Sequence, residues 1–386
     1  MDQGNKLRDE NKIIGGGTLA AAAAAAIHQQ RSSTEPKKIE RKIFVIHQLK
    51  HPEEVILLRS IYGDSFKLIG VSCSDYTKKH YLTKIKNVAE YNSELLIKRD
   101  RDENKPNGQH TSDTFHMSDY FINIPDNNYN ESLNNQVDRL FRILFRIYVV
   151  PPTKEEFCMF IAWSTSLRSA DLSRQVGACI ANERGDIISV GANDVPCFGG
   201  GTYWPSPQDA RDYVLRQDEN KKEISRMIDN IAESIADEFG IDVSRCKEIL
   251  EKTKMNRITE YGRSMHAEMD ALMAASRNTI SVAGCILYTT TFPCHNCARH
   301  IVGSGINEII FIEPYPKSMA MHLHRDSITE SDEKNKVKLR PFIGVSPRMY
   351  PHVFSLINKN GVKHERKNKK GDIAETKKQR RHPSQN

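Results

Sequence analysis

Two short clusters of metal-ligating residues constrain the fold of this chain more than any other feature. The first reads Met265-His266-Ala267-Glu268, and the second reads Pro293-Cys294-His295-Asn296-Cys297. Zinc prefers imidazole and thiolate ligands, and a catalytic zinc takes three protein ligands and leaves a fourth position to water. His266, Cys294 and Cys297 form such a set, so we expect the chain to bring the two clusters together around Zn2+.

The local pattern predicts that both clusters lie at helix starts. Helices are expected over His266–Ala275 and Cys294–Val302, and the positive end of a helix dipole favours thiolate over thiol. Glu268 is not needed as a ligand. Because bound zinc acidifies its water, a carboxylate beside that water can take the proton and pass it to a substrate. Glu268 is therefore the expected catalytic acid–base.

The cysteine pair has two other interpretations, a structural zinc site and a redox-active pair. A structural zinc would need a fourth ligand, for which His295 or His300 could be offered, although His295 is expected to point elsewhere on its helix. A redox-active C-x-x-C pair would leave His266 and Glu268 without a role. The joint occurrence of H-x-E and P-C-x-x-C is instead the signature of zinc-dependent nucleobase deaminases.

Segments beyond the metal ligands resemble the deoxycytidylate (dCMP) deaminase branch of that group. They are Ser173–Ile180, Gly191–Pro196 and Leu287–Cys294. The resemblance implies that Asn193 contacts the sugar hydroxyl of a nucleotide and that the backbone at Ala267 reads the pyrimidine ring. Without the resemblance, Asn193 would be interpreted as an ordinary turn residue.

Four further segments resemble the bacterial antiviral deoxycytidylate deaminases, which join a P-loop kinase-like domain to a dCMP-deaminase-like domain. The segments are 199–204, 260–272, 312–318 and 341–350. This resemblance implies deamination of dCMP and dCTP, which depletes deoxycytidine nucleotides during phage infection, and it implies that Tyr315 helps to close the base pocket. The chain departs from the family at its start, because Gly15–Gly17 lacks the Lys and Ser/Thr of a phosphate-binding loop.

The predicted elements and the resemblance indicate an α/β fold, a cytidine-deaminase-like three-layer α/β/α sandwich with a mixed sheet. The expected divisions are a low-complexity leader at 1–38, a partial kinase-like α/β domain at 39–148, a deaminase domain at 151–358 and a basic disordered tail at 359–386. The partial domain is expected to begin with a strand over Lys42–Leu49 and a helix over Pro52–Ile61.

A charged insertion, 209–257, interrupts the expected deaminase domain and is predicted to form helices. It is interpreted as a solvated helical hairpin, with subunit packing or capping of substrate phosphates as alternatives. Arg211, Arg257 and Arg263 are candidate phosphate partners on charge alone.

Charge and cysteine usage narrow the function further. The net charge is +7, and residues 359–386 alone carry ten Lys or Arg against three acids, so the remainder is neutral. A protein domain that binds a polynucleotide usually presents a basic face. The neutral remainder of this chain therefore favours a small-molecule substrate. The tail itself has three interpretations, which are a solvated end, a nucleic-acid contact and a localisation signal. The sequence has no run of about 20 apolar residues, so it predicts no membrane-spanning helix. Its eight cysteines are mostly isolated, which indicates a reducing, cytoplasmic setting.

The leading hypothesis is a zinc-dependent hydrolase that deaminates free deoxycytidine nucleotides and forms a homo-oligomer, the latter by resemblance. One rival is a polynucleotide deaminase acting on tRNA adenosine or single-stranded DNA cytosine, which would need a basic channel. The second rival is a non-catalytic nucleotide-sensing protein that keeps the metal for stability. Glu268 counts against the second rival, because a structural zinc does not need that carboxylate.

Overall fold

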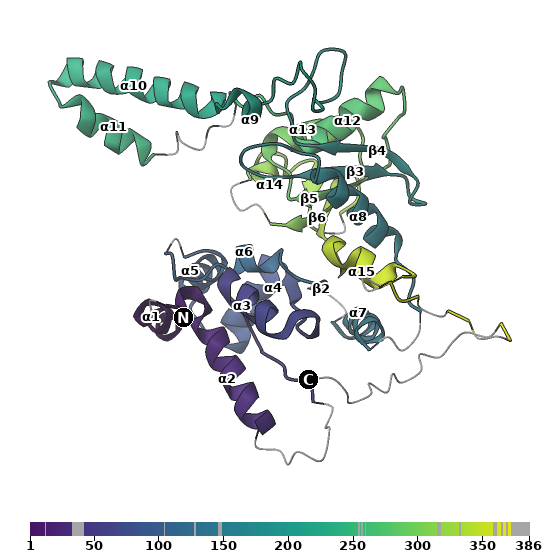
Figure 1. The fold of residues 1–386 in the computed structure, drawn as a ribbon. Coiled ribbons are helices and arrows are strands. Elements are labelled where there is room, and N and C mark those ends of the chain that lie inside the picture. The colour runs from purple at the N-terminus through teal and green to yellow at the C-terminus, as the bar shows by residue number, and fades with distance from the viewer. Residues whose placement is uncertain are drawn as a thin grey trace. The chain divides into compact units, whose positions relative to one another are not determined.

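The computed structural model describes residues 1–11, 13–32, 42–103, 105–126, 129–145, 149–253, 255, 258, 260–314, 318–331, 333–357, 361–363, 366–367 and 370–371. The chain forms two compact units. The first comprises Met1–Glu156, Ile312–Pro314 and Pro341–Asn386, and the second comprises Phe157–Phe311 and Tyr315–Arg340. Figure 1 labels many of their elements. Among the described helices, none combines the length and apolar character needed to cross a bilayer.

The first unit surrounds a small three-stranded sheet with helices. Strand β2 pairs in parallel with β1 and antiparallel with the short β9. Tyr120, Ile122, Leu140 and Val345 form its buried centre. The elements of this unit are α1 (Asp2–Glu10), α2 (Thr18–Ser32), α3 (Pro52–Tyr62), β1 (Ile69–Cys73), α4 (Asp75–His80), α5 (Glu90–Arg101), α6 (Thr111–Phe115), β2 (Tyr120–Ile124), α7 (Tyr129–Leu144), β9 (Gly344–Val345) and α15 (Tyr350–Phe354).

The strand expected over Lys42–Leu49 is wrong, because residues 42–50 run without regular secondary structure. The side chains of Ile43 and Val45 are 71% and 87% exposed. A strand needs a neighbouring edge for its backbone groups, and none of the described strands pairs with this segment. The helix after it is confirmed as α3, which begins at Pro52 and has a capping box formed by His51 and Glu54.

The second unit is built on a six-stranded mixed sheet in the order β4-β3-β5-β6-β8-β7. Strand β3 is antiparallel to β4 and β5, whereas β7 and β8 are parallel. The strands are β3 (Gly177–Ala181), β4 (Ile187–Ala192), β5 (Ile286–Thr291), β6 (Glu308–Glu313), β7 (Ile328–Thr329) and β8 (Val337–Pro341); the helices are α8 (Lys154–Ser166), α9 (Asp212–Leu215), α10 (Glu219–Phe239), α11 (Val243–Glu251), α12 (Ala267–Arg277), α13 (His295–Gly303) and α14 (Ala320–Leu323).

Two glycines show that helices cover both faces of this sheet. Gly191 is paired with Ala178, so the two share a face, and neighbouring Gly177 points to the other face. A methyl group on Gly177 would collide with the backbone of Ala162 in α8, and one on Gly191 would collide with the backbone of α12 at Ala267. The helices α8 and α12 therefore lie on opposite faces, which confirms the predicted three-layer α/β/α fold.

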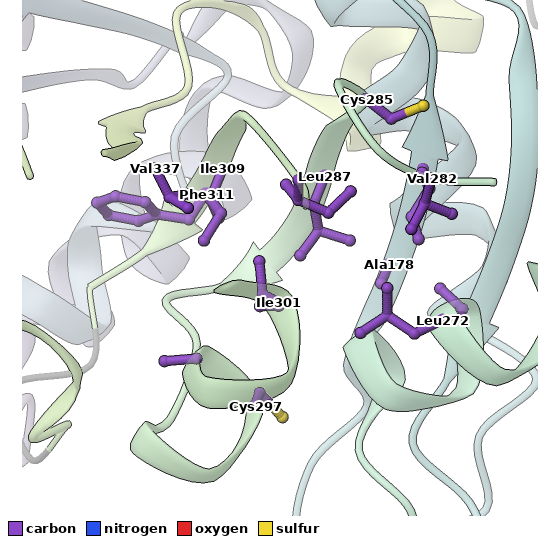
Figure 2. Close-up of a cluster of buried hydrophobic side chains, with 14 of the residues drawn as sticks. Ala178, Leu272, Val282, Cys285, Leu287, Cys297, Ile301, Ile309, Phe311 and Val337 are labelled. Carbon is purple, nitrogen blue, oxygen red and sulfur yellow. The ribbon is translucent and has the colours of Figure 1, made fainter. Parts of the chain in front are cut away.

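The main core of the second unit lies between the sheet and the pair α12 and α13. Leu287 of β5, Ile309 of β6 and Ile301 of α13 are completely buried there (Figure 2). Cys297 belongs to the same cluster, so one expected metal ligand is anchored directly on the core.

The charged insertion forms a helical hairpin of α10 and α11, as expected. Ile224, Ile228, Ala232 and Ala236 of α10 are buried, together with Cys246 of α11. Figure 1 shows the two helices lying side by side and extending from the second unit. Each is capped by an aspartate, Asp218 for α10 and Asp242 for α11.

Candidate active site

The two expected ligand clusters lie at helix N-termini in the second unit. His266 is the N-cap residue of α12, and Cys294 is the N-cap residue of α13. The thiol sulfur of Cys294 accepts a hydrogen bond from the backbone N–H of Cys297 at 3.4 Å. Strand β5 leads directly into this cap. The strand–turn–helix geometry therefore turns a C-x-x-C spacing into two sulfur atoms on the same side of one helix end.

The three side chains come together around one point. Nδ1 of His266 lies 3.3 Å from Sγ of Cys294 and 3.3 Å from Sγ of Cys297. The three ligand atoms all lie within 4.8 Å of one another. Two thiolates and an imidazole are the donor set that zinc prefers, with a fourth position left for water. The residues present therefore fit a catalytic zinc site.

The electrostatics of the cluster favour a charged cysteine beside a charged histidine. The hydrogen bond from Cys297, followed by that from His266, lowers the pKa of Cys294 to about 3. The hydrogen bond with Cys294 is the main reason why the pKa of His266 rises to about 9. Cys297 is more deeply buried, and its hydrogen bond to Cys294 raises its pKa. The lowered pKa of Cys294 favours its thiolate, which is the form of cysteine that binds zinc.

Glu268 is buried against this cluster in the first turn of α12. Its side chain is 4% exposed, and Oε2 lies 3.5 Å from Sγ of Cys297. Burial is the main cause that raises its pKa. A carboxyl group that holds a proton more readily than usual is suited to general acid–base chemistry. Its position beside the ligands suits the acid–base role expected from the sequence.

Asn193 lies at the end of β4, and both ends of its side chain are engaged. Oδ1 accepts the N–H of Val176 at 2.6 Å, and Nδ2 donates to the carbonyl of Arg174 at 2.8 Å. Its side chain is 7% exposed. Asn193 therefore ties the chain entering β3 to the chain leaving β4, as a turn residue would. Its expected contact with the sugar stays a prediction.

The structure describes only some of the other residues that were expected to contact the substrate. Ala267 is completely buried at the first position of α12, next to His266. Tyr315 lies outside the described residues, as does Arg257. Arg263 is partly exposed and pairs with Asp212 at 2.7 Å.

A buried ion-pair network beside the site was missed by the sequence reasoning. Arg211 pairs with Asp194 at 3.2 Å and with Asp209 at 2.7 Å, and all three side chains are at most 5% exposed. Asp194 also exchanges backbone hydrogen bonds with Met265, the residue before His266. Arg211 therefore has a structural role in this conformation, because its guanidinium group is already paired with the carboxylates of Asp194 and Asp209. Its spacing from Asp209 was the available signal, but nothing in the sequence indicated Asp194 as the second partner.

The mixed sheet places three candidate metal ligands at two helix N-termini, with a buried carboxyl group beside them, which is the arrangement expected of a zinc-binding deaminase domain. Residues 152–313 match the model of the cytidine and deoxycytidylate deaminase zinc-binding region. The chain belongs to the cytidine and deoxycytidylate deaminase family, as its sequence predicted.

Individual relatives match the same part of the chain. The deoxycytidylate deaminase of Enterobacteria phage T4 is 32% identical over 162 residues, which are 41% of this chain and 77% of the phage protein. The human deoxycytidylate deaminase is 27% identical over 186 residues, 48% of this chain and 71% of the human protein. Among solved structures, the dCMP deaminase of cyanophage S-TIM5 in apo form is 16% identical, with a TM-score of 0.29, and covers 50% of this chain and 100% of its own.

Proposed function

We propose that this protein is a zinc-dependent enzyme that converts dCMP to dUMP by hydrolytic deamination. The observation that carries the proposal is the buried carboxyl group of Glu268 next to the His266, Cys294 and Cys297 cluster. Relatives named as deoxycytidylate deaminases support the choice of substrate.

The zinc would be held by His266, Cys294 and Cys297, and it would supply a bound water with a pKa near 7. Glu268 would take one proton from the attacking water and deliver it to N3 of the cytosine ring, while the water oxygen bonds to C4. Glu268 would then pass the proton of the new C4 hydroxyl to the amino group, and the C4–N bond would break to release ammonia. The products are a uracil ring and ammonia, so Glu268 returns to its starting state.

Substrate recognition is proposed from the resemblance. Asn193 would contact the sugar hydroxyl, the Ala267 backbone would read the pyrimidine ring, and Tyr315 would close the base pocket. Because both polar atoms of the Asn193 side chain are already engaged by backbone groups, its Oδ1 would use its second lone pair for the nucleotide.

The wider proposal follows the same resemblance. It includes dCTP as a second substrate, a homo-oligomer, a cytoplasmic setting and a role in depleting deoxycytidine nucleotides during phage infection. The basic tail at 359–386 is proposed as a site of nucleic-acid contact because of its charge. The divisions at 39–148 and 151–358 also stay predictions.

The test is a deamination assay on the full chain, purified with zinc and with its metal content measured. The protein is offered dCMP, dCTP, CMP and a cytosine-containing oligonucleotide in parallel, and products are separated by chromatography. The control is Glu268→Gln, which keeps the shape of the side chain and should retain zinc. Turnover of dCMP that falls at least about 100-fold in Glu268→Gln supports the proposal.

Two outcomes would contradict it. Turnover of the oligonucleotide alone would favour the polynucleotide deaminase. No turnover of any substrate by a zinc-loaded, folded protein would favour the non-catalytic sensor.

A further inference from the structure

The three candidate metal ligands are positioned in two different ways. Cys294 and Cys297 belong to one helix cap, because the Cys294 sulfur accepts the backbone N–H of Cys297. His266 is reached instead through residues 262–264, which have no regular secondary structure. It caps α12 without a side-chain hydrogen bond to that helix. The position of His266 therefore depends on contacts with distant parts of the chain.

Two contacts hold the segment that ends at His266. The backbone groups of Met265 and Asp194 exchange hydrogen bonds of 2.9 and 3.2 Å. Nη1 of Arg263 lies 2.7 Å from a carboxylate oxygen of Asp212, and these two side chains are 32% and 17% exposed. Both contacts are made within three residues of the candidate ligand.

Both contacts lead to the first residues of the insertion 209–257. Asp212 is the first residue of α9, the short helix that precedes the hairpin (Figure 1). Its neighbour Arg211 pairs with the Asp194 carboxylate at 3.2 Å, and both of these side chains are at most 4% exposed. Nε and Nη2 of Arg211 also donate to Asp209 at 2.9 and 2.7 Å. This forked pairing holds the planar guanidinium group in one orientation.

We propose that Arg211 and Asp212 are positioning residues for His266, so that the start of the insertion sets how tightly the site holds zinc. Arg211 acts through Asp194 and Met265, and Asp212 acts through Arg263. Neither Arg211 nor Asp212 supplies a ligand atom. The inference rests on the proposed zinc site but not on the identity of the substrate.

The first test measures the zinc affinity of the full chain by competition with a chromophoric chelator, without any deamination assay. We expect Arg211→Gln to weaken zinc binding about tenfold, the lower end of the loss caused by removing an outer partner of a metal ligand. Arg211→Lys keeps the positive charge and should recover part of this loss. Circular dichroism checks that each variant is folded.

The second test uses the partly exposed pair, whose loss the fold should tolerate even if Arg211→Gln does not fold. Asp212→Asn and Arg263→Gln should each weaken zinc binding about threefold, because a partly exposed ion pair contributes less than a buried one. The double variant should bind no more weakly than either single variant, since both remove the same pair. The matched control is Glu308→Gln, which removes a similarly exposed ion pair with Arg340 and should leave the affinity unchanged.

The third test distinguishes positioning of His266 from a general loosening of the site. Cobalt(II) in place of zinc gives visible absorption from its thiolate ligands and from its d–d transitions, which depend on the ligand set. Because the two cysteines keep their own helix cap, Asp212→Asn and Arg211→Gln should retain the thiolate absorption. Their d–d bands should move toward those of His266→Ala, which lacks the imidazole.

The inference is overturned if the folded variants Asp212→Asn and Arg211→Gln bind zinc as tightly as the unmodified protein. It is also overturned if the thiolate absorption is lost together with the d–d bands, because the ion pairs would then support the whole site and not His266. An unmodified protein that binds no zinc would overturn the proposed function as well, so the two failures are distinguishable.

Discussion

At the scale of single residues, the candidate site could be predicted because its chemistry is local in the sequence. His266 and Glu268 are two residues apart, Cys294 and Cys297 are three apart, and each pair starts a helix. The helix geometry then determines where the side chains point. Tertiary partners were not predictable in this way: Arg211 was a candidate phosphate ligand on charge alone, and the structure buries it between two aspartates.

Replacing Asn193 should cost stability before it changes catalysis. Asn193→Ala removes the acceptor of the Val176 N–H and the donor to the Arg174 carbonyl, so we expect a loss of about 1–3 kcal/mol in the free energy of unfolding. Urea denaturation measures it. Asn193→Asp keeps the acceptor for Val176 but sets a second oxygen against the Arg174 carbonyl, so it should also lose stability. Equal stability of all three proteins would contradict the bracing role.

The Asp209–Arg211 pair should make stability depend on acid. The hydrogen bond from Arg211 lowers the pKa of Asp209 to about 2, below its value in an unfolded chain, near 3.9. The pair therefore stabilises the fold above about pH 4 and loses this effect as the pH falls toward 2. Asp209→Asn should flatten the fall in unfolding free energy between pH 5 and 3. An unchanged slope would contradict this prediction.

At the scale of elements, close packing across the second sheet depends on two glycines. Gly177 and Gly191 allow the backbones of α8 and α12 to approach opposite faces of the β3–β4 pair. The sequence predicted α12, which was expected as a helix over His266–Ala275. It did not predict which glycine faces which helix, because that depends on the strand register.

Adding one methyl group at either glycine should therefore be destabilising. We expect Gly177→Ala and Gly191→Ala each to lower the free energy of unfolding by about 1–3 kcal/mol, because the added carbon meets helix backbone that cannot rotate away. The matched control is Gly303→Ala at the end of α13, where a Cβ meets nothing within 4 Å. Chemical denaturation compares the three variants, and a loss at Gly303 as large as at Gly177 would contradict the packing argument.

At the scale of the whole molecule, long-range pairing limited the prediction. The segment Lys42–Leu49, which was expected to form a strand, has four consecutive apolar residues from Ile43 to Ile46 but pairs with none of the described strands. The sheet of the first unit is instead completed by β9, which pairs with β2 from far along the sequence. No local pattern indicates such a partner, because a strand of two residues is too short to show the alternation of apolar and polar side chains that predicts a strand.

Zinc should stabilise one unit more than the other. The candidate ligands His266, Cys294 and Cys297 all belong to the second unit. Zinc at 100 times its dissociation constant adds about 2.7 kcal/mol to the state that binds it. Calorimetry of the full chain should therefore show one unfolding transition that rises with zinc and one that does not. His266→Ala is the control, and a rise of both transitions together would contradict the prediction.

The first unit is assembled from three separate stretches of the chain, with the residues of the second unit lying between them in sequence. A ribosome that adds about 5–20 residues per second would deliver β9 about 10–40 s after β2. During that interval the small sheet has an open edge, while all residues of the second unit are made. The nascent chain must therefore protect the edge of β2 through most of its own synthesis, and the order of translation becomes part of how this protein folds.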